Sequence, residues 1–360
     1  MHQPPAYKER DDDLHRTPQP QPQPQAHRQQ PPRNFRQNYY TSLGFHVLEV
    51  KPTLENAFAG DVLDLDRLAK LCLWVRIPHL YRPLVWKVLL GVLPTSKTTW
   101  EYVEDQRRIQ FQDLKRSAVL IYTPPRAYAT HPAFVAAVRH DASGIEVTAG
   151  LMVRMLLIQL NRTDPCRVIP FRNLEPIASC FLDICDSATE ADAFWLFKFF
   201  AMRELRMVDF GSGEADSART DEYQQKRMAE SINNLWKLVQ QQDHDLSERL
   251  HHLEVDLEVC CESWYFHYFA DVLPPESLER IWDVLFGGAP AILDYVALCL
   301  ILAVQRQIQA ARGKGDVYNL LRGDTISNHV NHQAVVSSAI DLWEKPILDI
   351  MSESSKSLVS

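Results

Sequence analysis

Glycine is scarce in this chain and contributes 12 of its 360 residues, about 3% against a usual 7%. The sequence contains neither GxxxxGK[ST] nor GxGxxG, the patterns in which glycine lets the backbone approach a phosphate group. We therefore do not expect the chain to bind a nucleotide in the manner of a GTPase or a kinase. The scarcity also argues against a sheet built from many tight hairpins.

Long hydrophobic runs and an export signal are also lacking. The longest apolar run, Tyr295–Val304, has ten residues, which is too short to cross a bilayer and is typical of a buried helix. The first 33 residues are polar and rich in proline and glutamine, unlike a signal peptide. The seven cysteines lack the spacing of a disulfide framework. They are predicted to be reduced thiols in a cytoplasmic, non-transmembrane protein.

The chain has no strong excess of charge. Its net charge of −8 and its pI near 5.9 indicate no nucleic-acid partner. We predict no cofactor and no metal site. Two histidines and two cysteines come closest to a zinc site, but the cysteines are adjacent on a predicted helix and do not form a CxxC pair: His251, His252, Cys260 and Cys261.

What the sequence does contain is helical periodicity and a composition that is 46% apolar, enough for a substantial core. We predict a disordered Pro/Gln-rich tail (1–33), one all-α domain (34–350) and a flexible C-terminus (351–360). The predicted helices cover 52–58, 63–75, 78–91, 97–122, 132–139, 146–160, two segments within 173–204, 222–241, 246–253, two segments within 262–288, 292–309, a short segment after 314, and 328–346. Residues 161–170 and 210–221 are predicted to be loops.

The stretch Glu262–Gly288 is the most aromatic part of this pattern and predicts two amphipathic helices joined by a turn at Pro274–Pro275. Each aromatic side chain can bury about 150–250 Å², so the hairpin should lie in the core. Its large apolar residues are Trp264, Phe266, Tyr268, Phe269, Leu278, Ile281, Trp282, Leu285 and Phe286.

The predicted helix 97–122 has two apolar faces. The first is sufficient to dock the helix on the core; it consists of Trp100, Val103, Phe111, Leu114, Ala118 and Ile121. The second is patchier, with Tyr102, Ile109 and Leu120 among charges. It is either a surface for a partner helix or ordinary scatter of apolar residues on a surface, and the pattern alone leaves both interpretations open.

Three segments resemble the TBC domain, the helical domain of GTPase-activating proteins for Rab GTPases: RPLVWKVLLG at 82–91, DAFWLFKFF at 192–200 and LPPESLERIWDVLF at 273–286. The residues that carry this resemblance are Arg82, Trp86, Trp195, Arg280, Trp282 and Asp283. The resemblance implies a single multi-helical domain. We interpret these residues as fold determinants, with the tryptophans as core anchors and the arginines bonded to helix ends.

Active members of this family supply an arginine from an IxxDxxR motif and a glutamine from a YxQ motif to the GTPase. Here Arg172 stands at the glutamine position, and the closest imitation of the arginine motif, 158–164, has Asp164 at the arginine position. The chain is therefore predicted not to be an enzyme and to have no catalytic residue. The alternative is an active Rab GTPase-activating protein that uses Arg162 or Arg172.

The apparent loss of both groups, together with NFRQNYY at 34–40, resembles a non-catalytic branch of the family. This resemblance implies binding to the coiled coil of hamartin in the tuberous sclerosis complex and, through hamartin, to tuberin. The complex activates GTP hydrolysis by Rheb and so restrains the TOR kinase. The resemblance also implies recruitment to lysosomal membranes and cytoplasmic vesicles, and contact with a Rab GTPase. On this basis Tyr102, Ile109 and Leu120 are expected to face the coiled coil. A helical adaptor for another partner is a third interpretation.

Overall fold

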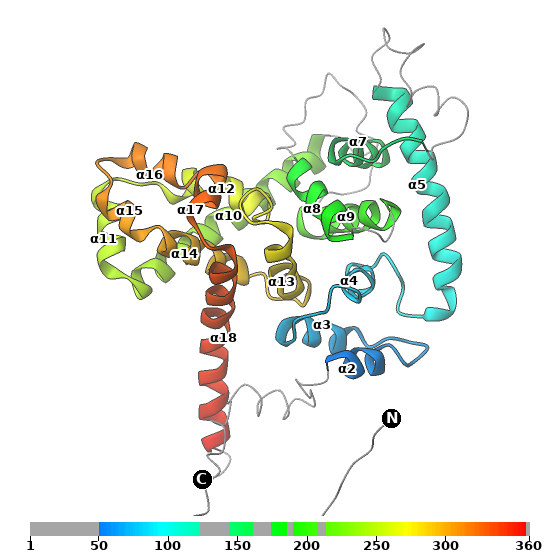
Figure 1. Ribbon diagram of the computed structural model, residues 1–360, viewed down its shortest axis with the longest axis horizontal. Helices are drawn as coiled ribbons and strands as arrows, with labels where there is room; N and C mark the ends of the chain where they lie inside the picture. The colour runs from blue at the N-terminus through cyan, green and yellow to red at the C-terminus, as the bar shows by residue number, and fades with distance from the viewer. Residues whose placement is uncertain (1–49, 123–143, 161–173, 186–189, 207–213, 358–360) are drawn as a thin grey trace, which may run out of the picture. The chain divides into compact units, whose positions relative to one another are not determined.

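The computed structural model describes residues 50–122, 144–160, 174–185, 190–206 and 214–357 (Figure 1). The chain divides into two units, Met1–Phe45 and His46–Ser360, and all described residues lie in the second. These residues form helices and one isolated antiparallel bridge, between Val62 and Ser96. The all-α prediction is confirmed.

The helices follow one another along the chain as α2 Val50–Ala57, α3 Leu65–Trp74, α4 Arg82–Leu90, the 3₁₀ turn η1 Lys97–Thr99, α5 Trp100–Tyr122, α7 Ala149–Gln159, α8 Glu175–Cys185, α9 Glu190–Glu204, α10 Glu214–Gln242, α11 His244–His252, α12 Leu257–Phe266, α13 Pro275–Phe286, α14 Ile292–Ala303, α15 Gln305–Ala310, α16 Lys314–Leu320, α17 Gly323–His329 and α18 His332–Ser357. Among them, no helix is both long enough and apolar enough to span a membrane.

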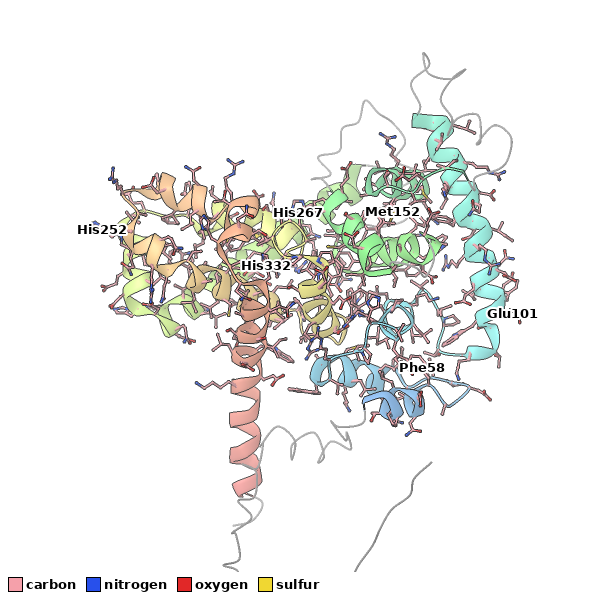
Figure 2. The ribbon with its side chains drawn as sticks, in the orientation of Figure 1. Phe58, Glu101, Met152, His252, His267 and His332 are labelled. Carbon is pink, nitrogen blue, oxygen red and sulfur yellow. The ribbon has the colours of Figure 1, made fainter. Side chains whose placement is uncertain are left out.

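Helix α13 is the central packing element of this unit. It packs against α3, α4, α8, α14 and α18 (Figure 1). Helix α5 instead packs against α7 and α9. Side chains fill the space between α7 and α8, and Met152 of α7 is fully buried (Figure 2). The helices of the unit therefore form several layers. Helix α5 packs on α9, α9 packs on α4, and α4 packs on α13 in the core.

Local hydrogen bonds explain several helix boundaries. Asp64 accepts from the backbone N–H of Arg67 at 3.1 Å and begins α3. Thr148 caps α7 in the same way, through the N–H of Leu151 at 3.2 Å. Gly91 ends α4 with a φ of 84°, a conformation that glycine adopts without strain. These signals lie within a few residues of the boundary, so the sequence alone predicts them well.

The core around α13 is aromatic, as the sequence predicts. Trp282 stacks on Phe200 with 5.3 Å between ring centroids and lies 5.0 Å from Phe181. Trp86 meets Phe286 edge-to-face at 4.9 Å. All five side chains are at most 2% exposed, and such ring pairs contribute about 0.5–1.5 kcal/mol each beyond the burial of their area.

The connection between α12 and α13 is longer than the predicted turn at Pro274–Pro275. Helix α12 ends at Phe266, and the next residues include Tyr268 and Phe269 with φ of 51° and 66°. A left-handed backbone costs a residue with a bulky side chain about 1–3 kcal/mol. Burial of both rings and the bond from the indole N–H of Trp282 to the Tyr268 carbonyl at 3.2 Å offset that cost.

Four other boundaries also differ from the prediction. Helix α4 begins at Arg82, not at residue 78, and α10 begins at Glu214, so the predicted loop 210–221 is wrong from that residue onward. The predicted helix 292–309 is interrupted at Val304, and the final helix continues past Pro346 to Ser357. Helix α17 was not predicted. The predicted tail 1–33, helix 132–139 and loop 161–170 lie outside the part of the chain that the structure describes.

Candidate functional site

A buried ion pair joins α4 to α13. The carboxylate of Asp283, which is 0% exposed, accepts from the Trp86 indole Nε1 at 2.9 Å and from Arg82 Nε at 3.2 Å. Arg82 also donates to the carbonyl of Ile77 at 2.6 Å and pairs with Glu279. Burial raises the pKa of Asp283 to about 6, and the positive charge of Arg82 limits the rise. At neutral pH the carboxylate is therefore ionised and balances a buried guanidinium.

Arginine side chains also bind the exposed carbonyls at helix ends. Arg280 donates to the carbonyls of Cys72 and Leu73 at 2.7 Å each, at the end of α3. Arg203, which the sequence analysis did not select, donates to Leu89 at 3.3 Å and to Phe286 at 3.5 Å. The last carbonyls of a helix lack intrahelical partners and carry partial negative charge, so these cations hold α3, α4 and α13 in place. The sequence offers no local signal for Arg203.

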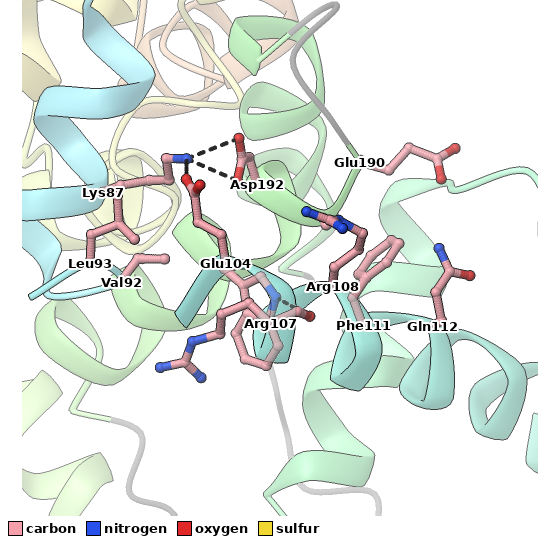
Figure 3. Close-up of a pocket in the computed structure, with 12 residues that line it drawn as sticks. Lys87, Val92, Leu93, Glu104, Arg107, Arg108, Phe111, Gln112, Glu190 and Asp192 are labelled. Atoms are coloured by element: carbon pink, nitrogen blue, oxygen red, sulfur yellow. Dashed lines mark hydrogen bonds and ion pairs between the residues drawn. The ribbon is translucent and has the colours of Figure 1, made fainter. Parts of the chain in front are cut away.

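Helix α5 is attached to the core through buried cations and one tryptophan. Lys87 of α4 donates to Glu104 at 2.9 Å and to Asp192 at 3.3 Å, as Figure 3 shows. Burial acts to lower the pKa of Lys87, but the two carboxylates outweigh it and raise the pKa above its usual value. The indole of Trp195 in α9 donates to the backbone carbonyl of Arg107 at 3.0 Å. These contacts fix the orientation of α5 about its axis.

A second buried lysine holds α5 further along. Lys115 is 1% exposed and donates to Glu190 of α9 at 2.8 Å. The predicted docking face is correct at Phe111 and Ala118, which are buried, but wrong at Ile121, which is 51% exposed. Glu190 on the neighbouring helix compensates the charge of Lys115, which would otherwise be costly to bury.

The opposite side of α5 carries an apolar line, defined as Tyr102, Ile109 and Leu120. Their exposed fractions are 70%, 57% and 38%. A helix turns about 100° per residue, so Tyr102 and Leu120, 18 residues apart, share one direction, and Ile109 deviates from it by about 20°. At about 1.5 Å per residue the apolar line is about 27 Å long.

One ion pair of α5 lies beside the apolar line, and a second lies along it between Ile109 and Leu120. Arg108 binds Asp105 at 3.0 Å, and Arg116 binds Asp113. Both pairs join residues three apart on the same helix, and the Asp113–Arg116 pair separates Leu120 from Ile109 along the line. A narrow apolar seam with charges of both signs at its sides is the pattern by which helices recognise one another in coiled coils. The exposed face of α5 is therefore suited to a long helical partner.

The residues that bear on catalysis lie elsewhere in the chain. Arg162 and Arg172 fall outside the described residues, so the structure gives no geometry for either motif. Of the histidines weighed as metal ligands, His251 stacks on Trp236 with 4.4 Å between the rings. Within the described ranges, no group of three or more His, Cys, Asp or Glu residues could hold a metal ion. The α5 face is the candidate site that the geometry supports best.

The chain is similar to known proteins that carry a TBC domain. The Rab-GTPase-TBC domain model matches residues 171–309. TBC1 domain family member 7 of Xenopus tropicalis is 29% identical over 318 residues, which cover 87% of this chain and 95% of that protein. The Homo sapiens protein of the same name is 27% identical over 319 residues, with coverage of 87% and 95%.

The fold agrees with this result. The crystal structure of the Ypt/Rab-GAP domain of Gyp1p matches with a TM-score of 0.55 and covers 84% of this chain and 99% of that domain. At 13% identity this likeness concerns the fold alone. The three motif segments lie on α4, α9 and α13. Helix α4 packs against both α9 and α13. The chain is therefore similar to TBC-domain proteins over most of its length, and residues 171–309 match the Rab-GTPase-TBC domain.

Proposed function

We propose that this chain is a non-catalytic TBC-domain subunit that binds the coiled coil of hamartin in the tuberous sclerosis complex. In this role it supports the GTPase-activating action of the complex on Rheb and the restraint of TOR signalling. It acts in the cytoplasm and at the lysosomal membranes to which the complex is recruited. Similarity to TBC1 domain family member 7 over 87% of the chain supports the proposal.

The observation that carries the proposal is the apolar line on α5. Helix α5 is fixed on its inner side by Lys87, Lys115 and Trp195. Its outer side therefore presents a rigid surface, which lowers the entropic cost of binding. Complete burial of a Leu or Ile side chain contributes about 1.5–3 kcal/mol. A partner helix that covers the line would thus gain several kcal/mol.

The binding test replaces two residues of the apolar line with charges. In the double variant Tyr102→Glu/Ile109→Glu, we expect the affinity for a hamartin coiled-coil fragment to fall at least 100-fold, about 3 kcal/mol. Two other exposed apolar residues give matched controls, Leu80→Glu and Val259→Glu, whose side chains are 89% and 62% exposed. Calorimetric titration measures affinity, and circular dichroism checks the fold. Equal affinities in all variants would refute the assignment of this face.

The catalytic test is single-turnover GTP hydrolysis by a panel of Rab GTPases and by Rheb. We expect the chain alone to leave each intrinsic rate unchanged, because an arginine finger contributes about 10³–10⁵ in rate and the motif that carries it is altered. Hydrolysis by Rheb should accelerate only when hamartin and tuberin are present. A 100-fold acceleration of any Rab by the chain alone would instead establish an active enzyme. Arg162→Ala and Arg172→Ala would then identify the residue responsible.

A further inference from the structure

The apolar line on α5 belongs to a longer stripe of residues on the same side of the helix. Helix α5 lies at the edge of the unit (Figure 1). We define the α5 stripe as the residues that follow one another at alternating steps of four and three: Tyr102, Gln106, Ile109, Asp113, Arg116 and Leu120. A helix turns about 100° per residue, so all six side chains lie within about 40° of the direction of Tyr102. This spacing is the repeat of the contact positions in a coiled coil.

An ion pair interrupts the apolar residues of the stripe. Asp113 and Arg116 are bonded to each other and lie between Ile109 and Leu120. Ile109 and Leu120 are 11 residues apart, which is about 16 Å along the helix axis. A partner helix that covers both apolar residues therefore also covers the ion pair.

The remaining charges of α5 point away from the stripe. Among the charged residues of this helix, only Asp113 and Arg116 lie within about 40° of the direction of Tyr102. Arg107 lies about 160° from Ile109, beside a cavity of about 390 Å³ between α4, α5 and α9 (Figure 3). A helix docked on the stripe covers the opposite side of α5 and does not reach this cavity. The ion pair is therefore the charged group that such a helix must accommodate.

Covering the pair takes both charges out of water. The side chains of Asp113 and Arg116 are 59% and 25% exposed, and an exposed pair of this kind contributes little to stability. Desolvation of two charges costs as much as, or more than, the burial of two aliphatic side chains gains. A partner that is apolar at this level would therefore lose the benefit of covering Ile109 and Leu120.

A partner with the opposite charges avoids this loss. The bond within α5 joins Nη2 of Arg116 to Oδ1 of Asp113, so Oδ2 of Asp113 can accept from a cation on the partner. A guanidinium carries five N–H donors, which is more than one carboxylate oxygen can use. Polar contacts between apolar layers are the means by which coiled coils specify register. We propose that the partner helix places a lysine or arginine opposite Asp113 and a glutamate or aspartate opposite Arg116, and that this charge match fixes the position of the coiled coil along α5.

This inference rests on the proposed function, and the test separates the two. Full-length chain is titrated calorimetrically with a hamartin coiled-coil fragment at about 50 and 300 mM NaCl, and circular dichroism checks the fold. The exchange variant Asp113→Arg/Arg116→Asp keeps the net charge and a pair of opposite charges on the helix, but it sets like charges against the partner. We expect it to weaken binding about 30-fold or more.

A second variant removes both charges. Asp113→Leu/Arg116→Leu makes these positions of the stripe apolar, and leucine is a good helix former. We expect binding to weaken about 10-fold, because the charges of the partner lose their counterparts, and to depend less on salt. Tighter binding than that of the unchanged chain would show that the partner is apolar at this level. That result would overturn the proposal even if the exchange variant failed to fold.

A photoreactive group at Tyr102 measures the register. With benzoylphenylalanine in this position, the otherwise unchanged chain should cross-link to a single turn of the fragment. In the background of Asp113→Leu/Arg116→Leu, cross-links should also occur about seven residues away, because the apolar repeat alone permits a shift by one heptad. Cross-linking to the same single turn in both backgrounds would overturn the role in register.

The control exchanges an exposed pair elsewhere in the chain. His244 and Glu248 of α11 are 65% and 71% exposed, and His244→Glu/Glu248→His should bind within about twofold of the unchanged chain.

The outcomes are distinct. Normal affinity and normal salt dependence in the exchange variant would overturn the charge match, while the proposed function would stand if Tyr102→Glu/Ile109→Glu still abolishes binding. Failure of the unchanged chain to bind the fragment would overturn both. Weakened binding in both variants of the Asp113–Arg116 pair, with the α11 control unaffected, would support the charge match.

Discussion

Replacing Asp283 with asparagine removes one charge from the interior and leaves the side-chain volume nearly unchanged. The carboxylate of Asp283 accepts from Trp86 and twice from Arg82, through Nε at 3.2 Å and Nη2 at 3.3 Å. The amide oxygen can still accept from Trp86 and from Arg82 Nε, which both bond Oδ1, but the NH₂ group would face Nη2 of Arg82. Arg82 would lose the buried negative charge and would keep Glu279 as its only carboxylate partner among the described residues.

The expected magnitude follows from this geometry. Removing one partner of a buried ion pair costs about 3–5 kcal/mol. Arg82 retains Glu279, whose side chain is 13% exposed, so the cost should be at the low end, about 3 kcal/mol at pH 7.5. Large domains lose about 2–4 °C per kcal/mol, so the melting temperature should fall by about 6–12 °C.

Urea unfolding followed by circular dichroism measures this loss, with an unchanged m value showing that the transition remains comparable. Asp113→Asn is the control, because the side chain of Asp113 is 59% exposed in its pair with Arg116, and exposed pairs contribute about 0–1 kcal/mol. The double variant Arg82→Met/Asp283→Leu removes both charges. It should be more stable than Asp283→Asn, because no buried guanidinium remains without its counter-charge and Glu279 keeps its contact with His79.

Two results would refute this reasoning. A loss below about 1 kcal/mol in Asp283→Asn would show that charge compensation does not hold α4 to α13. A double variant less stable than Asp283→Asn would show that the pair contributes through its own attraction and hydrogen bonds, and not through avoidance of an unpaired buried charge.

Three further predictions concern packing, capping and thiol reactivity. Gly287→Ala should lower the free energy of unfolding by about 1–3 kcal/mol, because the new Cβ would lie 2.9 Å from a backbone oxygen of α3. Gly315→Ala meets nothing within 4 Å and should raise the free energy of unfolding by up to about 1 kcal/mol. Equal melting temperatures for the two variants would contradict both expectations. Arg280→Met should cost about 2–3 kcal/mol in denaturant unfolding, because two short charge-assisted bonds to α3 are lost, and an unchanged midpoint would count against this cap. Burial raises the pKa of Cys180 and Cys185 to about 12, so about one thiol in 10⁴ is ionised at pH 8. Iodoacetamide should therefore label both residues only after unfolding. Rapid labelling of either thiol in the native protein, mapped by mass spectrometry, would disprove this expectation.

Local signals in the sequence were sufficient for much of the fold. Asp64 before α3 and Gly91 after α4 mark helix ends through contacts within a few residues. The apolar spacing of α13 predicts its buried face, and Trp282 lies there at 0% exposure. These features depend on the periodicity and capping chemistry of a single helix, which the sequence states directly.

Contacts between distant residues were beyond the reach of the sequence pattern. Tyr268, whose backbone is left-handed, donates its hydroxyl to the carbonyl of Glu204, 64 residues away. The pairing of Arg82 with Asp283 spans 201 residues, and nothing near either residue indicates its partner. The same holds for the cavity beside Arg107, which exists only because α9 brings Trp195 against α5.

Helix α5 shows where the two kinds of information meet. Its sequence alone indicated a helix with a surplus apolar face and identified Tyr102, Ile109 and Leu120, which the structure places on the exposed side. Only the tertiary structure decided that Ile121 is exposed and that Lys115 is buried, where Glu190 of α9 compensates its charge. Periodicity determines which side chains share a face of a helix, whereas the neighbouring helices determine which face is covered and which charges can be buried there.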